Sequence, residues 1–113
     1  MNNISTRGQA PALKFEVVLL TGRAADCGRY GPRALPQVSA EEIAGMAGLD
    51  YVDLAERIVT PFIDGCVPAA DLRVILRETD AQFRHDAVAP MVQIAHNQWV
   101  MELFHGPTLA FKD

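Results

Sequence analysis

The sequence predicts an α+β fold, with a mainly helical domain over residues 1–88 followed by a β-hairpin that begins a second domain over residues 89–113. Two changes in pattern support this division. Apolar residues recur at helical spacing between residues 39 and 83, and after Pro90 the spacing changes to the period of two that is typical of strands. A chain of 113 residues is long enough for one small domain and the beginning of another.

The first 36 residues predict one short helix within otherwise irregular structure. Residues 1–13 are polar and contain a proline, which is typical of an extended lead-in. Residues 14–22 combine strand propensity with an apolar spacing of i, i+3, i+4, and Gly22 stands where a helix C-cap is expected. Of the two alternatives we favour the helix. Residues 22–36 are rich in glycine and proline and predict an irregular loop.

Two helices are predicted in the next segment. Ser39 and Glu42 have the S-x-x-E spacing of a capping box, in which each side chain binds the other residue's backbone N–H. The helix behind them is expected to end near Gly48. Asp50 is placed to cap a second helix, which Pro61 is expected to kink or break because proline lacks an N–H.

A fourth helix is predicted after the turn at residues 65–68, with Pro68 suited to its first position. One apolar face supports this helix, and its residues follow a spacing of 3.6: Leu72, Ile75, Leu76, Thr79 and Phe83.

Beyond Pro90, residues 91–94 and 99–104 predict two strands of a β-hairpin around Asn97-Gln98. The Gly-Pro-Thr sequence at residues 106–108 is expected to end the second strand. Thr108 is then placed to cap a further helix that begins at Leu109.

The charge distribution excludes one class of partner. The net charge is −4, and residues 37–86 carry ten acidic and four basic side chains. Nucleic-acid binding requires a basic face, so we expect no nucleic-acid partner.

The sequence also predicts a cytoplasmic protein that has no membrane partner. No apolar run approaches the ~20 residues of a membrane span, and the first five residues lack the layout of a secretory signal. Cys27 and Cys66 are therefore expected as free thiols, and with the histidines they form no spacing that is typical of metal ligands, so no metal is expected.

The last ten residues, FHGPTLAFKD, resemble the segment of threonine synthases that carries the cofactor lysine. Two further stretches resemble the same family: residues 5–8, STRG, match its opening motif, and residues 20–32 resemble its sequence LTGLAPDGGLYVP. The resemblance extends over nearly all of the chain. It implies that the hairpin begins the α/β domain of a fold-type-II pyridoxal-phosphate (PLP) enzyme.

The resemblance also implies an activity, namely the PLP-dependent conversion of O-phospho-L-homoserine and water to L-threonine and phosphate. Lys112 is then the catalytic residue and the covalent attachment point of PLP, with Phe111 beside the cofactor. Thr108 and Arg7 are implied as substrate contacts, since an arginine suits a phosphate group. The remainder of the PLP-binding domain is the implied partner, and the 113 residues by themselves are expected to be inactive.

Two alternatives remain open from the sequence. One is a related phospho-lyase that eliminates phosphate from O-phosphohomoserine without making threonine. The other is a stand-alone helical interaction module without catalysis. The family pattern is interrupted at several positions, among them four where Arg23, Cys27, Arg29 and Gly31 replace leucine, glycine, leucine and valine. Cys27 is expected to reduce stability if its position requires a positive φ, and the two arginines put the local packing in doubt.

Overall fold

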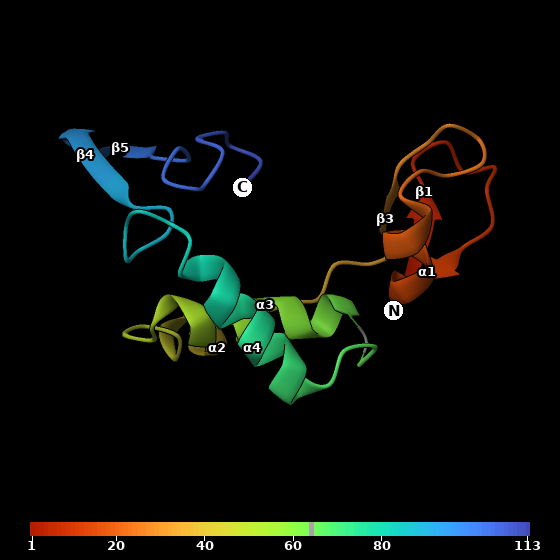
Figure 1. Ribbon diagram of the computed structural model, residues 1–113, viewed down its shortest axis with the longest axis horizontal. Coiled ribbons are helices and arrows are strands. Elements are labelled where there is room, and N and C mark those ends of the chain that lie inside the picture. The colour runs from red at the N-terminus through yellow and green to blue at the C-terminus, as the bar shows by residue number, and fades with distance from the viewer. Residues whose placement is uncertain (64) are drawn as a thin grey trace.

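The computed structural model describes residues 1–63 and 65–113, which contain four helices and five strands in two small sheets. The fold is mixed α/β, and three parts follow one another along the chain (Figure 1). An N-terminal sheet with one helix comes first, three helices follow, and a β-hairpin with an irregular C-terminal segment comes last.

The N-terminal part is built around β1 (Asn2–Ser5), the central strand of a three-stranded antiparallel sheet. β2 (Leu13–Lys14) pairs with one edge of β1 and β3 (Tyr30–Pro32) pairs with the other. The predicted short helix is confirmed as α1 (Phe15–Thr21), which follows β2 directly. It ends at Gly22, whose φ of 69° lies in the region that favours glycine.

The three-stranded sheet is the main departure from the predictions for residues 1–13 and 22–36. The first strand lacks an apolar pattern, because its inward-facing residues are the polar Asn3 and Ser5, which are 6% and 4% exposed. The third strand contains Pro32, which normally argues against a strand. It is tolerated because β3 pairs only with β1 and lies at an edge of the sheet.

The predicted capping box is present at the start of α2 (Ala40–Ala44). The Ser39 Oγ accepts a hydrogen bond from the Glu42 N–H at 3.1 Å, and the Glu42 carboxylate accepts one from the Ser39 N–H at 2.7 Å. The hydrogen bond from the Ser39 N–H has the largest effect on the Glu42 carboxylate, and together with the Ser39 hydroxyl it lowers the pKa of Glu42. The helix is shorter than predicted, because it ends at Ala44 and the chain continues in turns to Gly48.

The second predicted cap is also present, at the start of α3 (Tyr51–Ile63), where Asp50 Oδ1 accepts a hydrogen bond from the Asp53 N–H at 2.8 Å. The break that was one of the two outcomes predicted at Pro61 is absent, because the helix continues to Ile63. Pro61 lies in the last turn, so its missing N–H removes a hydrogen bond only at the end of the helix.

The fourth helix, α4 (Ala69–Asp80), packs against α3, and its bounds place Pro68 at the N-cap, one residue before the predicted position. Leu72 faces inward and is 6% exposed, whereas Ile75 of the predicted apolar face is 52% exposed. The guanidinium of Arg73 forms ion pairs with Asp53 and Glu56 of α3. The hydrogen bonds that the guanidinium donates to Asp53 and Glu56 raise the pKa of Arg73.

The predicted β-hairpin is confirmed as β4 (Met91–Ala95) and β5 (Gln98–Met101), with Asn97 in the turn at a φ of 55°. The second strand ends three residues before the predicted position. All nine strand residues are exposed, and apolar side chains alternate onto both faces of the hairpin. Strands that are apolar on both faces are typical of a sheet that is covered on both sides.

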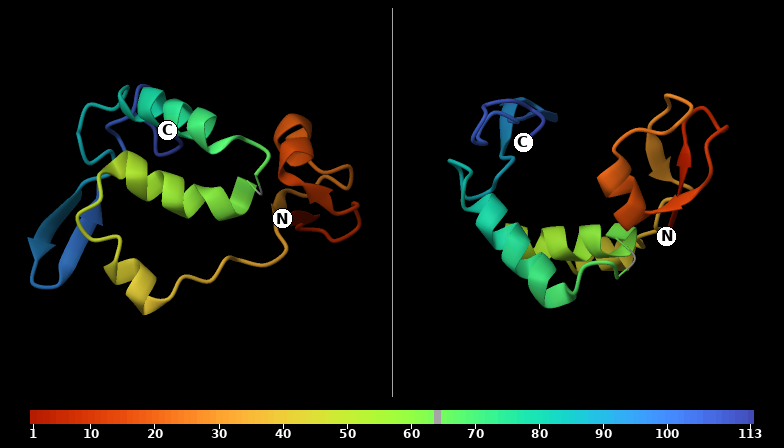
Figure 2. Two further views of the ribbon diagram at one scale, coloured as in Figure 1. Left: turned by 90° about the horizontal axis from the view of Figure 1, so that it is seen from below. Right: turned by 45° about the vertical axis from the view of Figure 1, so that its right-hand side comes forward.

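The described part of the chain is open. Figure 2 shows the N-terminal sheet and the C-terminal segment as separate arms at opposite ends of the helices. The radius of gyration is 16.4 Å, against roughly 13 Å for a compact domain of this length. The accessible surface is 8328 Å², against about 6,100 Å² for a compact monomer of this mass. The buried apolar residues in this part are Ala24, Ile63, Leu72 and Val88.

Candidate functional site

The predicted cofactor lysine lies in an irregular turn at the end of the C-terminal segment. Residues 106–113 form consecutive turns, so the helix that was predicted to begin at Leu109 is absent there. Leu109 itself has a φ of 60°, which a right-handed helix does not allow. Lys112 is exposed, and it has no hydrogen bond or ion pair with any described residue. Phe111 is 75% exposed.

Thr108 has a different role from the predicted helix cap. Its backbone N–H donates to Asp113 Oδ2 at 2.9 Å, and its hydroxyl donates to Asp113 Oδ1. The hydroxyl is therefore bound to a carboxylate five residues further along the chain, where a helix cap would accept from an N–H two or three residues further along. The hydrogen bond from the Thr108 hydroxyl, which has the largest effect, and those from three backbone N–H groups lower the pKa of Asp113.

The segment that leads into this turn is fixed to the preceding loop. The His105 ring lies 2.7 Å from a Glu102 carboxylate oxygen, measured from Nε2 to Oε2, and its centroid lies 5.2 Å from the His85 ring. Two backbone hydrogen bonds join the same segments, from the Arg84 N–H to the His105 carbonyl at 2.9 Å and from the Glu102 N–H to the Pro90 carbonyl at 3.0 Å. The start of the lysine turn is thereby held against residues 84–90.

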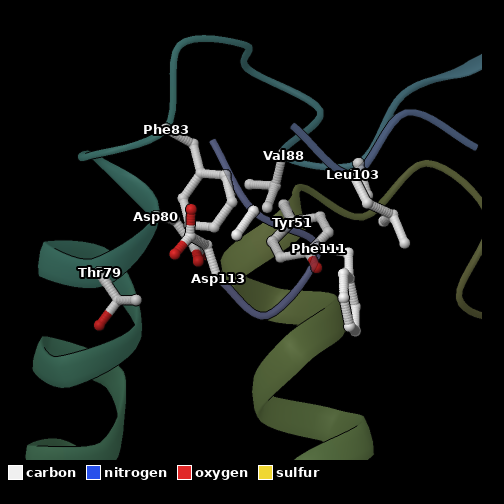
Figure 3. A pocket seen from close by; sticks show the side chains of 10 residues that line it. Tyr51, Thr79, Asp80, Phe83, Val88, Leu103, Phe111 and Asp113 are labelled. Atoms are coloured by element: carbon white, nitrogen blue, oxygen red, sulfur yellow. The ribbon is translucent and has the colours of Figure 1, made fainter. Parts of the chain in front are cut away.

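A pocket of about 170 Å³ lies where the lysine turn meets the helices (Figure 3). It is lined by the start of α3, the end of α4, the following loop and the C-terminal segment, with side chains from Tyr51, Thr79, Asp80, Phe83, Val88, Ala89, Leu103, Ala110, Phe111 and Asp113. Lys112 is not among the lining residues. The lysine turn therefore contacts this pocket through the neighbours of Lys112.

Asp80 is the anomalous residue of this pocket. Its Oδ2 is buried and has no hydrogen-bond partner among the described residues, and burial raises the pKa of the carboxyl group. Asp80 is also the last residue of α4, where the helix dipole favours a positive charge. Nothing in the described structure compensates for a carboxylate at this position.

The family motif at residues 5–8 forms a second cluster, which we call the Asp26 clasp. Ser5 Oγ donates to Asp26 Oδ1 at 2.7 Å, and the N–H groups of Gly28, Gln9 and Ala10 donate to the same carboxylate at 2.9, 3.0 and 2.9 Å. Burial of the carboxylate raises its pKa, but these four hydrogen bonds together outweigh that effect and lower the pKa of Asp26 to about 2. The clasp joins the end of β1 to the loop before β3.

Arg7 belongs to the clasp mainly through its backbone, since its N–H donates to Ser5 Oγ at 3.1 Å. Its exposed guanidinium makes one long hydrogen bond, from Nη1 to the Asp26 carbonyl at 3.4 Å. Arg7 lies in the N-terminal arm, whereas Thr108, Phe111 and Lys112 lie together in the C-terminal segment, and Figure 1 shows these two parts well separated.

The four departures from the family pattern that were singled out above lie in or next to this loop. Cys27 has a φ of 64°, which is the conformation that disfavours a residue with a side chain, so the predicted local strain is present. Arg23 is exposed and donates through Nε and Nη2 to the Cys27 carbonyl at 3.4 and 3.3 Å. Arg29 is also exposed, and a Cβ at Gly31 would meet nothing within 4 Å. Within the described residues the two arginines are thus accommodated at the surface.

Sequence reasoning missed the two carboxylates that organise these clusters. Asp26 lies in a stretch that was interpreted as an irregular loop, and its partners are up to 21 residues away. Asp113 lay next to the predicted lysine, but a Thr-x4-Asp spacing is not a known capping signal. The repeated Gly and Pro residues around each carboxylate were the available signal that a tight turn surrounds it.

Two further kinds of feature are absent from the described residues. No group of three or more His, Cys, Asp or Glu side chains in residues 1–63 and 65–113 is arranged to hold a metal ion. None of the helices described for this chain has both the length and the apolar character needed to cross a membrane.

Comparisons with known proteins agree on one family. A family model described as "Threonine synthase N terminus" matches residues 2–79. Threonine synthase from Pseudomonas aeruginosa is 58% identical over 113 residues, covering 100% of this chain and 24% of the relative. Threonine synthase from Methylobacillus glycogenes is 42% identical over 125 residues, covering 100% of this chain and 26% of the relative.

A solved structure shows the same fold. The crystal structure of PLP-bound threonine synthase from Brucella melitensis matches with a TM-score of 0.93 and 52% identity, covering 99% of this chain and 24% of that chain. The chain thus spans about a quarter of the length of the relatives that it matches.

Proposed function

Because this chain belongs to the threonine synthase N-terminus family, we propose that the full-length protein containing it converts O-phospho-L-homoserine and water to L-threonine and phosphate with PLP. The observation that carries the proposal is the 58% identity to a threonine synthase along the whole chain. Since the chain spans about a quarter of that relative, the reaction belongs to the longer protein, to which these residues contribute one part of the site.

Lys112 and Phe111 are the residues proposed to hold PLP. The chemistry of the available groups fits this role, because a lysine amine that is accessible and free of an ion pair is available to react with the aldehyde of PLP once it has lost its proton. Lys112 meets both conditions among the described residues. The exposed ring of Phe111 offers an apolar surface beside it. The 113 residues supply this attachment point, and the groups that bind the cofactor's phosphate are proposed to come from the rest of the protein.

Each remaining residue has a role that follows from its chemistry. When bound, PLP withdraws electron density from the carbon skeleton of the substrate. The Lys112 amine is proposed to take a proton from one substrate carbon and return it to another. Arg7 is proposed as a contact for the substrate phosphate, since its single long hydrogen bond leaves most of its donors free. Thr108 stays a predicted substrate contact, which would require its hydroxyl to leave Asp113.

The domain organisation is part of the same proposal. Residues 1–88 form the N-terminal domain, and residues 89–113 form the first strands and the lysine turn of the PLP-dependent α/β domain. The exposed apolar residues on both faces of β4 and β5 support this, because the two faces and the two open edges of the hairpin need further layers and strands. The excess surface of roughly 2,200 Å² has the size of a stable protein interface.

These residues alone are proposed to be inactive. The test compares the 113-residue chain with the full-length protein and with its Lys112→Ala variant, each supplied with PLP and O-phospho-L-homoserine. Phosphate release and threonine formation are measured separately. We expect both products only from the unmodified full-length protein, and we expect borohydride reduction to link PLP to Lys112.

Product analysis also separates the alternatives. Phosphate release without threonine would identify a phospho-lyase. The absence of PLP binding and of phosphate release in the full-length protein would support a non-catalytic module. Turnover by the 113-residue chain at the full-length rate would contradict the proposed inactivity.

A further inference from the structure

The turn that carries Lys112 is closed by the side chain of the next residue. One oxygen of the Asp113 carboxylate accepts from the Thr108 N–H at 2.9 Å, and the other accepts from the Thr108 hydroxyl. Backbone hydrogen bonds from Leu109 and Ala110 to this carboxylate also lower the pKa of Asp113. Asp113 therefore remains ionised at neutral pH and is surrounded by donors from one short stretch of chain.

The backbone is shaped to bring Asp113 back onto this stretch. The Asp113 N–H donates to the Ala110 carbonyl at 3.1 Å, and the Leu109 N–H donates to the Gly106 carbonyl at 3.2 Å. A Cβ built on the buried Gly106 would lie 2.4 Å from Asp113 Cβ and 2.5 Å from Oδ2. The carboxylate can thus occupy its position only because residue 106 has no side chain.

We propose that Asp113 and Thr108 form a clamp that positions Lys112 for its reaction with the cofactor and the substrate. Lys112 lies between the two ends of the closed turn, so the clamp fixes the backbone from which the lysine side chain projects. The proposal rests on the proposed function, because positioning matters only if Lys112 is the cofactor lysine. Asp113 acts through Lys112 and is a positioning residue.

The clamp gives Thr108 a role that differs from direct contact with the substrate. Both of its donors are already bound to Asp113, and the carboxylate accepts from them as a pair. Removal of either partner would release the same turn, so the effects of the two substitutions should not add. A substrate contact made by Thr108 would instead be independent of Asp113.

The test uses the full-length protein with five variants: Thr108→Val, Thr108→Ser, Asp113→Ala, the double variant of Thr108→Val with Asp113→Ala, and Thr60→Val. Thr60→Val is a matched control, because the Thr60 hydroxyl also makes a hydrogen bond, to the Glu56 carbonyl at 2.6 Å in α3. Each variant is measured for kcat, KM, bound PLP, the visible circular dichroism of PLP, and hydrogen exchange at residues 108–110.

We expect each single clamp variant to lower kcat by roughly 10- to 100-fold, because small displacements of a reacting group have effects of that size. KM should change by less than about twofold, since substrate binding is not the step affected. Exchange at residues 108–110 should accelerate and the circular dichroism of bound PLP should change. The double variant should resemble the more impaired single variant, Thr108→Ser should retain activity, and Thr60→Val should match the unmodified protein.

Three results would overturn the clamp. The first is that Asp113→Ala leaves both kcat and hydrogen exchange at residues 108–110 unchanged. The second is that the fold-changes in kcat of the two single variants multiply in the double variant. The third is a rise in KM that occurs in Thr108→Val and not in Asp113→Ala. Accelerated exchange at residues 108–110 in both single variants is expected even in protein without PLP. A full-length protein that does not bind PLP therefore refutes the proposed function and with it the positioning role, whereas the other outcomes refute the clamp alone.

Discussion

The Asp26 clasp depends on the absence of a side chain at residue 28, and Gly28→Ala tests this dependence. A Cβ at this position would lie 2.1 Å from Ser5 Oγ, 2.9 Å from Asp26 Oδ1 and 3.2 Å from the Arg7 nitrogen. The Ser5 hydroxyl would have to move by roughly 1 Å to reach an ordinary contact distance. It would then lose its 2.7 Å hydrogen bond to Asp26. One added methyl group should therefore open the clasp.

The expected size of the effect follows from the packing around Gly28, which is buried. Forcing extra atoms into a packed site costs about 1–3 kcal/mol. For amides that exchange through local opening of the clasp, this corresponds to acceleration of about 5- to 150-fold. The amides that should respond are those of Gln9 and Ala10, because both donate to Asp26.

Hydrogen exchange of the full-length protein, followed by mass spectrometry of peptides from residues 1–32, measures this effect. Gly31→Ala is the matched control, because a Cβ at Gly31 would meet nothing within 4 Å and its φ is not positive. Unchanged exchange in Gly28→Ala, or equal acceleration in Gly31→Ala, would refute the reasoning about the clasp.

Three other predictions follow from the same structure. The pKa of Asp26 is about 2 in the folded protein, against an ordinary value of 3.8. The stability that its ionised form contributes should therefore be complete above pH 3.8 and be lost as the pH falls through 2. The protection of the clasp amides against hydrogen exchange should follow this window in an acid titration, and it should not depend on pH between 5 and 7. Ser39→Ala should destabilise α2 by about 1 kcal/mol, seen as faster exchange of the Glu42 amide; no change there would contradict the role of the capping box. Leu72→Ala should destabilise the α3–α4 pair by about 2–5 kcal/mol in exchange measurements, whereas Val74→Ala, at a half-exposed position on the same helix, should have a smaller effect on that pair.

Local signals in the sequence predicted much of the fold. The capping box at Ser39, the cap at Asp50 and the period-two segments of the hairpin each involve residues close together in the chain, so their partners could be identified from spacing. The N-terminal sheet could not be predicted in this way. Its central strand buries Asn3 and Ser5, and Ser5 is satisfied by an aspartate 21 residues away.

The candidate site could likewise be predicted only in part from the sequence. Lys112 was identified by resemblance to a motif, since nothing in its own composition distinguishes it from a surface lysine. The helix expected at Leu109 is absent, since the φ of Leu109 is 60°, and the Thr108 hydroxyl donates to Asp113 where a cap would accept from a backbone N–H. Propensity alone could not choose between these two uses of the same hydroxyl.

The open β4–β5 hairpin has a consequence for biosynthesis. In the proposed full-length protein its partner strands come later in the chain, so a ribosome would expose its apolar faces and unpaired edges before they can be covered. The Asp26 clasp, by contrast, joins only residues 5–28 and can close while translation continues. Early folding at the N-terminus would thus coexist with an aggregation-prone hairpin until its partner strands are made.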